Sequence, residues 1–547
     1  MIEVPDARAP KASIAEVMTS TAYFDIVARF DGDSLWDLFD GDRSRLNIAT
    51  ECVDRHAELG SALFLCKPDG GYEDITFRDL SECSSAFAYE LAERGVEKGD
   101  RVAVILEPSL GYYAAIFGAI KRGAVAVPMF TLFGEDAVRA RVEDCKARVL
   151  VVGPDRPDLS STFAQQLDVI VFDGAFAAGL RRHPAVYVPD TSSKDLAVLQ
   201  YTSGTNKRTP DAVPHVQRSV VTLMRAALFG LGLRPGDRYF CPSSPGWGHG
   251  LWDGAIAPLA LGISTGAYVG RFEPERVVDA LRDREITNFA AAGTVYRMLR
   301  RPEHLGRLPR LEKASYTGEA LETDVIDALG RQVDTRICGM YGTTETGVLI
   351  ANFPGITDYE LRSGALGKPL PGLEVLVLDD EGQELPTGEM GEIAVRRSGR
   401  WLRTRDRGWT DGDGYFWYGG RADDVVISAG WTISPFEVEE AVMAHPDVVE
   451  VAVIGVPDLV RGQVLKAFVV SDAGETNLVE EIQDLVRHRL SAHEYPREIE
   501  VVQALPKTPG GKINRRELRE RERAMQGSSN TDSRGSVTQS PVASQQQ

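Results

Sequence analysis

The chain has 547 residues, 43% of them hydrophobic and 26% charged, and carries a formal net charge of -19 at pH 7. This length predicts a globular protein of two or more domains, and the acidic balance argues against nucleic acid or an anionic membrane as the main partner. The six scattered cysteines form no CxxC pair, and neither a secretory signal nor an apolar run of about 18 residues is visible, so we expect a reduced, cytoplasmic chain.

From about residue 100 onward, short apolar runs alternate with amphipathic stretches. The segment GYYAAIFGAIKRG (111–123) predicts a helix closed by glycine. The expected strands are RVAVIL (101–106), AVAVPM (124–129), ARVLVV (147–152), LDVIVF (167–172), LAVLQY (196–201), ITNFAAAG (286–293), KASYTGEA (313–320) and TRICGMYG (335–342). This alternation predicts an α/β fold of stacked, mostly parallel sheets with helices on their faces, whose ligands gather where strands end.

Composition changes at WLRTRDRGWTDGDGYFWYGG (401–420), which is rich in glycine and aspartate and predicts turns. We therefore expect a large N-terminal domain over 1–420 and a small, mobile α+β domain over 421–524. The small domain has its own expected helices at 435–445 and 477–490 and strands at 448–456 and 463–470. Residues 525–547 contain no aromatic and few aliphatic residues, which predicts a disordered tail.

The first chemistry-bearing motif is YTSGT (201–205), which follows an expected strand directly. In such a loop successive backbone N–H groups converge on an anion, and hydroxyl groups add donors. Thr202, Ser203, Gly204 and Thr205 would then hold phosphate. The alternative is an ordinary turn of small residues.

The second motif is MYGTTETG (340–347). Thr344 could donate to a phosphate, and Glu345 offers the oxygen ligands that a hard metal ion prefers. The alternative is a capped turn with a solvated glutamate.

Two further motifs lie near and within the small domain. In RTRDRGWTDGDGYFWYGGRADD (403–424), Asp406 offers acceptors for ribose hydroxyls and Arg421 a planar fork for oxygen anions. In PKTPGGKINRREL (506–518), Lys512 follows two glycines and precedes an expected helix. Each of these charged residues could instead be solvated surface.

Together the four motifs occur in the order and approximate spacing of the adenylate-forming superfamily, which includes acyl-CoA synthetases, firefly luciferases and peptide-synthetase adenylation domains. The resemblance runs from about residue 30 to 520 and is strongest to the medium-chain acyl-CoA and acetyl-CoA synthetase branch. It implies activation of a small-molecule carboxylic acid by ATP to an acyl adenylate, with pyrophosphate release, and then thioester formation with CoA. It also implies Mg²⁺ as cofactor and leaves a homodimer open.

The resemblance also implies roles for single residues. Lys512 resembles the adenylation lysine, Glu345 would contact the metal, and Thr344 would touch the α-phosphate. Asp423 matches the hinge of the small domain and Gly430 the entry of pantetheine. The remaining implied nucleotide-binding residues are Thr202, Ser203, Gly204, Thr205, Gly318, Glu319, Ala320, Tyr341, Gly342, Thr343, Asp406 and Arg421.

The sequence departs from the family pattern in the phosphate loop, which typically reads YTSGTTGKPKGV and here reads YTSGTNKRTPDAV. Asp211 stands where a lysine is expected, while Lys207 and Arg208 could supply the lost charge. The loop is therefore either remodelled or inactive. TRD (404–406) also replaces the usual TGD, and Thr432 stands where an arginine is common.

The acyl pocket is implied by Trp247, His249 and Gly342. Acetyl-specific relatives carry a tryptophan at the position of Gly342, so we expect a medium-chain, branched or aryl acid larger than acetate. His249 could contact a polar substituent or simply pack in the core. Two other functions stay open: an adenylating enzyme that loads a carrier-protein thiol, and a nucleotide-binding protein with impaired catalysis.

Overall fold

The computed structural model describes residues 11–201, 212–319, 321, 323–422, 426–428, 431–458, 462–471, 477–490, 495–508 and 511–532. The chain divides into two compact units. The large unit comprises Met1–Thr404 and Gly408–Tyr418, and the small unit comprises Arg405–Arg407 and Gly419–Gln547. The boundary thus lies two residues before the one expected at 420/421, and three residues around Asp406 join the small unit.

One sheet of the large unit has six strands in the described part of the chain, in the order β6-β5-β3-β4-β7-β8. All neighbours are parallel except β7 and β8. Its strands are almost wholly apolar, as expected for a parallel sheet covered on both faces. They are β3 (Arg101–Ile105), β4 (Val125–Pro128), β5 (Val149–Val152), β6 (Asp168–Val171), β7 (Leu196–Tyr201) and β8 (Ala212–Val216).

The second sheet has thirteen strands among the described residues, in the order β16-β17-β18-β19-β15-β14-β13-β12-β11-β9-β10-β1-β2. Strands β13, β12, β11, β9, β10 and β1 are parallel neighbours, whereas the pairs β1–β2, β13–β14, β14–β15, β15–β19 and β16–β17 are antiparallel. This sheet is therefore mixed, because short connections such as 344–346 join neighbouring strands as hairpins. The strands are β1 (Ser61–Cys66), β2 (Tyr72–Thr76), β9 (Tyr239–Phe240), β10 (Thr265–Tyr268), β11 (Asn288–Ala292), β12 (Lys313–Thr317), β13 (Ile337–Thr343), β14 (Gly347–Ala351), β15 (Ala365–Pro369), β16 (Val375–Leu378), β17 (Gly391–Arg397), β18 (Arg400–Thr410) and β19 (Phe416–Arg421).

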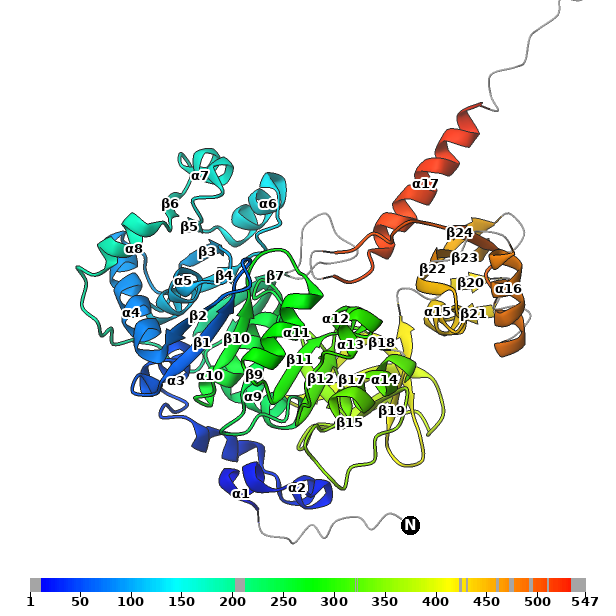
Figure 1. The fold of residues 1–547 in the computed structure, drawn as a ribbon, viewed down its shortest axis with the longest axis horizontal. Helices are drawn as coiled ribbons and strands as arrows, with labels where there is room; N and C mark the ends of the chain where they lie inside the picture. The colour runs from blue at the N-terminus through cyan, green and yellow to red at the C-terminus, as the bar shows by residue number, and fades with distance from the viewer. Residues whose placement is uncertain are drawn as a thin grey trace, which may run out of the picture. The chain divides into compact units, whose positions relative to one another are not determined.

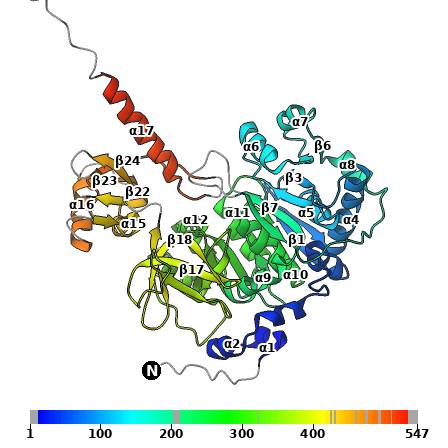
Figure 2. The ribbon, with the colours of Figure 1, turned by 180° about the vertical axis from the view of Figure 1, so that it is seen from behind.

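Helices α4 (Phe77–Glu93) and α5 (Leu110–Lys121) lie between the two sheets, since α4 contacts β1 and β2 while α5 contacts β3 and β4 (Figures 1 and 2). Thr76 and Asp79 form a capping box that starts α4. The two helices cross so closely at Gly118 that a Cβ there would lie 2.8 Å from the Ser84 carbonyl oxygen. The other helices of this unit are α1 (Ile14–Thr19), α2 (Tyr23–Arg29), α3 (Ile48–Cys52), α6 (Glu135–Cys145), α7 (Pro157–Phe163), α8 (Gly174–Leu180), α9 (Ser219–Arg225), α10 (Ala257–Ala260), α11 (Pro274–Asp283), α12 (Gly293–Leu299), α13 (Pro302–Leu305) and α14 (Thr323–Val333).

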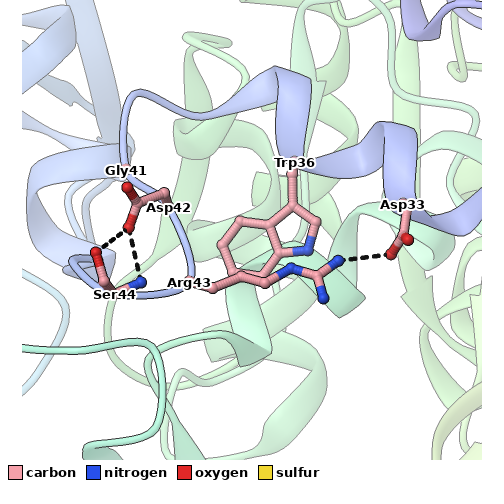
Figure 3. Close-up of a pocket in the computed structure, with 6 residues that line it drawn as sticks. All are labelled: Asp33, Trp36, Gly41, Asp42, Arg43 and Ser44. Carbon is pink, nitrogen blue, oxygen red and sulfur yellow. Dashed lines mark hydrogen bonds and ion pairs between the residues drawn. The ribbon is translucent and has the colours of Figure 1, made fainter.

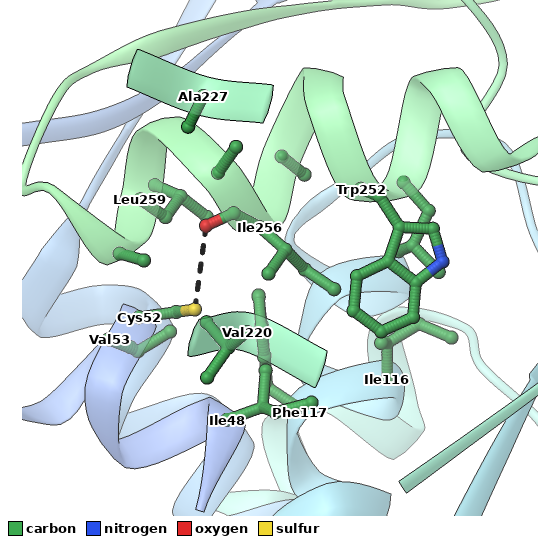
Figure 4. Packing of buried hydrophobic residues seen from close by; sticks show 14 of the residues in the cluster. Ile48, Cys52, Val53, Ile116, Phe117, Val220, Ala227, Trp252, Ile256 and Leu259 are labelled. Carbon is green, nitrogen blue, oxygen red and sulfur yellow. Dashed lines mark hydrogen bonds between the residues drawn. The ribbon is translucent and has the colours of Figure 1, made fainter. Parts of the chain in front are cut away.

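The π-helix η4 (His249–Ile256) carries His249, one of the expected acyl-pocket residues, and a buried cluster fixes its position. Figure 4 shows Trp252 and Ile256 of η4 packed with Ile116 and Phe117 of α5 and with Ile48 of α3. Because these apolar side chains are almost fully buried, η4 is held by hydrophobic packing from several elements.

The small unit contains a three-stranded sheet, β22-β23-β24, and the hairpin β20-β21. Alternate residues of β22 face two cores: Val451 and Val453 join a cluster with α15 and α16, whereas Ala452 and Ile454 join a cluster with Leu518 of α17. This is the period-2 pattern of a strand covered on both faces. The elements are β20 (Val426–Ser428), β21 (Trp431–Ile433), β22 (Val448–Asp458), β23 (Gly462–Ser471), β24 (Glu498–Val501), α15 (Pro435–Met443), α16 (Leu478–Arg489) and α17 (Arg515–Asp532).

Two expectations about the end of the chain need correction. The segment 401–420 contains strands β18 and β19, and only its middle is a turn, where Asp411 accepts hydrogen bonds from the N–H groups of Asp413 and Tyr415. The aspartates and glycines that suggested turns throughout are concentrated in that short connection. Helix α17 also continues to Asp532, into the segment assigned to a disordered tail.

All six cysteines are free thiols, and five of them are buried. Within the described residues, no helix combines the length and the apolar character that crossing a bilayer requires.

Candidate active site

Two of the expected nucleotide-binding segments, 318–319 and 341–345, lie at the ends of neighbouring strands of the thirteen-stranded sheet. Strands β12 and β13 are parallel, with Tyr316 opposite Gly339. Parallel neighbours end at the same edge, so Gly318–Glu319 after β12 and the turn after β13 lie side by side. A hydrogen bond from the Thr317 hydroxyl to the Met340 carbonyl oxygen, at 3.0 Å, joins the two strand ends.

Glu319 is tied to the start of helix α12. Its carboxylate accepts hydrogen bonds from the Thr294 N–H and hydroxyl, at 2.6 and 2.5 Å, and pairs with Arg297 at 3.0 Å. Burial would raise the pKa of Glu319, but the Arg297 charge and the Thr294 donors outweigh it and hold the pKa below its usual value. The Glu319 side chain therefore holds the segment 318–319 against the start of α12.

The turn after β13 is closed by reciprocal threonine contacts. The Thr343 N–H donates to the Thr346 hydroxyl and the Thr346 N–H to the Thr343 hydroxyl, both at 3.2 Å. Thr344 and Glu345 therefore stand at the tip of a braced turn, and Glu345 is exposed. The Glu345 carboxylate offers oxygen donors of the kind that Mg²⁺ prefers.

Neighbouring backbone atoms leave no room for a side chain at Gly342. A Cβ at this position would lie 2.1 Å from the Gly347 carbonyl oxygen and 2.7 Å from its carbonyl carbon. The close approach occurs where β13 and β14 shift register. Any side chain here requires the hairpin to move, so a tryptophan of the acetyl-specific type is incompatible with this turn.

Tyr341 is buried at the end of β13, 9% exposed, in a cluster with Leu349 and Ile350. Its ring lies 6.3 Å from that of Tyr418, with an interplanar angle of 49°. The tyrosine therefore forms a packed wall beside the turn that carries Thr344.

The expected acyl residues Trp247 and His249 lie together, with ring centroids 5.3 Å apart. His249 is 4% exposed, and its Nδ1 lies 2.9 Å from the Ser243 hydroxyl oxygen. Its Nδ1 is also 3.8 Å from the Cys241 sulfur. His249 is thus a buried histidine with polar neighbours, which agrees with the core-packing alternative and keeps a polar group beside Trp247.

Gln200 on β7 was not singled out from the sequence, but it forms hydrogen bonds with Gly246 and Trp252, on either side of Trp247 and His249. It is 1% exposed, accepts a hydrogen bond from Trp252 Nε1 at 2.9 Å and donates to the Gly246 carbonyl oxygen at 3.4 Å. Gln200 directly precedes the phosphate-loop motif. A glutamine inside the apolar run LAVLQY was the sequence signal for it, since a buried polar residue needs a partner.

In the small unit, Asp406 and Arg421 are brought together. Arg421 Nη1 lies 3.2 Å from Asp406 Oδ1, and the Asp406 side chain is 7% exposed. Arg405, which replaces the usual glycine, has a φ of 63°, the left-handed region that favours glycine. The position where the family pattern has glycine thus adopts a backbone conformation that favours glycine, although this chain has an arginine there.

Lys512 is exposed and lies in the small unit between Gly511 and Ile513. Its backbone N–H donates to the Thr508 hydroxyl at 3.3 Å. Several expected site residues fall outside the described residues: Thr202, Ser203, Gly204, Thr205, Lys207, Arg208, Asp211, Ala320, Asp423 and Gly430. Thr432 lies on β21.

Two other polar clusters of the large unit are structural. Figure 3 shows a pocket of about 550 Å³ in which Arg43 lies across Trp36, 5.7 Å from the ring centroid, and pairs with Asp33 at 2.9 Å. The carboxylate of Asp42 accepts hydrogen bonds from the backbone and hydroxyl of Ser44. Since these charged groups bind one another and none of the expected site residues lines the pocket, we do not place the active site there.

The second cluster is Glu90, Glu93 and His183, whose ligand atoms lie within 4.8 Å of one another. Arg94 and Arg182 both pair with Glu90, the former at 2.8 Å. These guanidinium groups satisfy the carboxylate, so we interpret the cluster as an ion-pair network that joins α4 to the segment after α8.

Comparisons with known proteins cover both units. Residues 52–401 match the family model for AMP-binding enzyme, and residues 437–512 match that for AMP-binding enzyme C-terminal domain. The chain is 34% identical over 523 residues to the acetyl-coenzyme A synthetase of Bacillus subtilis, covering 87% of this chain and 90% of the relative. It is 30% identical over 491 residues to the human mitochondrial acyl-coenzyme A synthetase ACSM3, covering 82% and 83%.

Among solved structures, the chain is similar to the anthranilate CoA ligase AuaEII in complex with anthranoyl-AMP. The TM-score is 0.81 at 29% identity, and the match covers 89% of this chain and 99% of that one.

Proposed function

Since the chain belongs to the family of AMP-binding enzymes, we propose that the loops after β12 and β13 hold ATP for an acyl-CoA ligase whose acid is larger than acetate. The chain is an AMP-forming acid–CoA ligase. A carboxylate oxygen attacks the α-phosphorus of ATP and pyrophosphate leaves. The CoA sulfur then attacks the acyl carbon, the acyl–phosphate bond breaks, AMP leaves, and the thiol proton passes to solvent.

The main support for the nucleotide site is that the parallel strands β12 and β13 end at the same edge of the sheet. The backbone of Gly318 and Glu319 would face the adenine, because the Glu319 side chain is already bound to Thr294 and Arg297. Tyr341 would pack against the adenine base. The rest of the lining would come from Ala320, Gly342 and Thr343. Thr344, at the tip of the braced turn, would donate to the α-phosphate.

The small unit would supply the ribose contacts. Asp406 has two acceptor oxygens for vicinal hydroxyls and is held in place by Arg421. The phosphate-loop residues Thr202, Ser203, Gly204 and Thr205 would grip the triphosphate, with Lys207 and Arg208 as the added cations. The buried partner network of Gln200 at the end of β7 gives that loop a fixed starting point.

The chemical obstacle in the first step is repulsion between two anions, because a carboxylic acid near pKa 4 is already ionised at pH 7. One such pair at ~3.5 Å costs about 5 kcal/mol at an effective dielectric of 20. The Lys512 ammonium would offset this cost between the carboxylate and the α-phosphate. Glu345 would hold Mg²⁺, which neutralises charge on the leaving pyrophosphate when bound.

In the second step Lys512 would have to leave the path of the thiol. Rotation of the small unit about Asp423 would remove it, and pantetheine would enter past Gly430. The six free thiols, five of them buried, fit a reducing compartment, and we assign the enzyme to the cytoplasm.

Gly342 supports an acid larger than acetate. No side chain fits at this position without moving β14, so the capping tryptophan of acetyl-specific relatives has no equivalent here. Trp247 and the buried His249 would line the acyl site, with a medium-chain, branched or aryl acid as occupant.

The test is release of pyrophosphate and AMP with acetate, butyrate, hexanoate, isobutyrate and benzoate, each with and without CoA. We expect CoA-dependent AMP release that is higher for at least one larger acid than for acetate. Acetate as the best substrate would overturn the pocket assignment. Pyrophosphate release without acyl-CoA formation would indicate a carrier-protein acceptor, and no pyrophosphate with any acid would indicate impaired catalysis.

A further inference from the structure

Lys512 lies in a short hairpin of the small unit. Its two arms, 505–508 and 512–518, both begin at the same buried cluster. Leu505, before the hairpin, and Leu518, after it, are 4% and 1% exposed and belong to the same buried cluster. The Thr508 N–H donates to the Lys512 carbonyl oxygen at 2.7 Å. The hairpin backbone is therefore closed at the lysine itself.

The two arms are also joined below the lysine. Lys507 and Ile513 form an antiparallel bridge, and the Asn514 N–H donates to the Pro506 carbonyl oxygen at 2.7 Å. Such cross-strand bonds restrict the backbone of 506–508 and 512–514.

Each arm is bound by an ion pair to the body of the small unit. Lys507 Nζ lies 2.5 Å from Glu450 Oε1 on β22. Arg515 Nη2 lies 2.6 and 2.7 Å from the two Glu439 oxygens on α15, and Arg515 Nε lies 3.2 Å from Oε1. The second pair thus uses two guanidinium nitrogens on one carboxylate, the stronger and more directional geometry.

Glu439 is the better shielded of the two acids. Its side chain is 10% exposed, against 25% for Glu450. Glu439 Oε1 also accepts the Val453 N–H of β22 at 2.7 Å. One carboxylate therefore ties helix α15, strand β22 and the arm that leads from Lys512 into α17.

We propose that Glu439 and Arg515 are positioning residues that fix the Lys512 hairpin to the small unit. On this account the backbone that carries the Lys512 side chain moves only when the whole unit moves, and the amine samples only the positions that its own side chain can reach. The inference rests on the proposed role of Lys512 in adenylate formation. A displacement of about 1 Å at a reacting group can lower a rate by 10²-fold, so the fixed backbone contributes to catalysis through Lys512.

The variant Glu439→Gln separates the two contacts of this carboxylate. A glutamine oxygen can still accept the Val453 N–H, while the charge that holds Arg515 is lost. Two half-reactions of the full-length enzyme would be measured: pyrophosphate release with acid and MgATP, and thioester formation from supplied acyl adenylate and CoA. We expect kcat for pyrophosphate release to fall at least tenfold, KM for ATP and acid to change less than threefold, and thioester formation to change less than twofold.

Two further variants should lower pyrophosphate release by smaller amounts than Glu439→Gln. Arg515→Lys keeps the charge but loses the paired nitrogens, so it should fall between the parent enzyme and Glu439→Gln. Glu450→Gln breaks the more exposed pair and should lower pyrophosphate release less than threefold. Equal losses in Glu450→Gln and Glu439→Gln would contradict a special role for the shielded pair.

Glu522→Gln is the matched control. Glu522 is also a buried carboxylate of the small unit, 7% exposed, and it pairs with Lys466 at 2.6 Å, but it lies beyond the hairpin on α17. Both variants should lower the melting temperature, whereas only Glu439→Gln should lower pyrophosphate release relative to thioester formation. The same selective loss in Glu522→Gln would overturn the proposal, since it would reflect general loosening of the unit.

A double variant completes the test. In Lys512→Ala, adding Glu439→Gln should lower pyrophosphate release by less than twofold, because a positioning residue has no effect without the residue it positions. A further tenfold loss would overturn the proposal while leaving the role of Lys512 intact. Failure of the parent enzyme to release pyrophosphate with any acid would instead overturn the proposed function.

Discussion

Arg405 shows how one residue can carry conformational strain beside a binding residue. Its φ of 63° is unfavourable for any residue with a Cβ, at a cost of about 1 kcal/mol, and its neighbour is Asp406. The free energy of unfolding of Arg405→Gly, measured by denaturant unfolding, should therefore exceed that of Arg405→Ala by about 1 kcal/mol. Both variants lack the arginine side chain, so their difference isolates the backbone. Equal stability of the two variants would show that the backbone is not strained.

Asp253 on η4 should make stability depend on pH. Burial raises its pKa to about 7, and its Oδ1 has no hydrogen-bond partner among the described residues. An acid whose pKa is raised on folding binds more protons in the folded state, so its contribution to stability is lost as pH rises from about 4 to about 7. Asp253→Asn should gain stability relative to the parent by about 3 kcal/mol more at pH 8 than at pH 5. A gain that is independent of pH, measured by denaturant unfolding, would contradict this assignment.

At the scale of elements, the β13–β14 hairpin should resist any side chain at Gly342. Because the Cβ position lies 2.1 Å from the Gly347 carbonyl oxygen, Gly342→Ala must displace the turn that carries Thr344 and Glu345. We expect a destabilisation of about 2 kcal/mol and at least a tenfold loss of activity with every acid. Glu345→Ala, on the same turn but exposed, should retain stability. A Gly342→Ala enzyme with unchanged stability and a new acid preference would contradict the hairpin explanation.

The elements that sequence reasoning predicted are those with strong local patterns. The expected strand at 101–106 and helix at 111–123 correspond to β3 and α5, since an apolar run and a glycine-closed amphipathic run leave few alternatives. Strands β18 and β19 were missed because turn-forming residues dominated the window, although β18 lies between β17 and β19, its neighbours in sequence. The Glu439–Arg515 pair joins residues 76 positions apart, which no local pattern can reveal.

At the scale of the whole molecule, the residues proposed for the reaction are divided between the two units. Those proposed for adenine, phosphate and acyl binding belong to the large unit, while Asp406, Arg421 and Lys512 belong to the small unit. Family motifs suggested these residues one by one. The residues that support them were not predictable, because Thr294, Arg297 and Ser243 act through contacts that only the fold creates.

The central claim is that Lys512 serves the first half of the reaction and not the second. The direct test is Lys512→Ala in the full-length enzyme, with pyrophosphate release and thioester formation from supplied acyl adenylate measured in parallel. The account predicts that pyrophosphate release falls at least 10²-fold, while thioester formation changes less than threefold. Equal losses in both half-reactions, or unchanged pyrophosphate release, would contradict it.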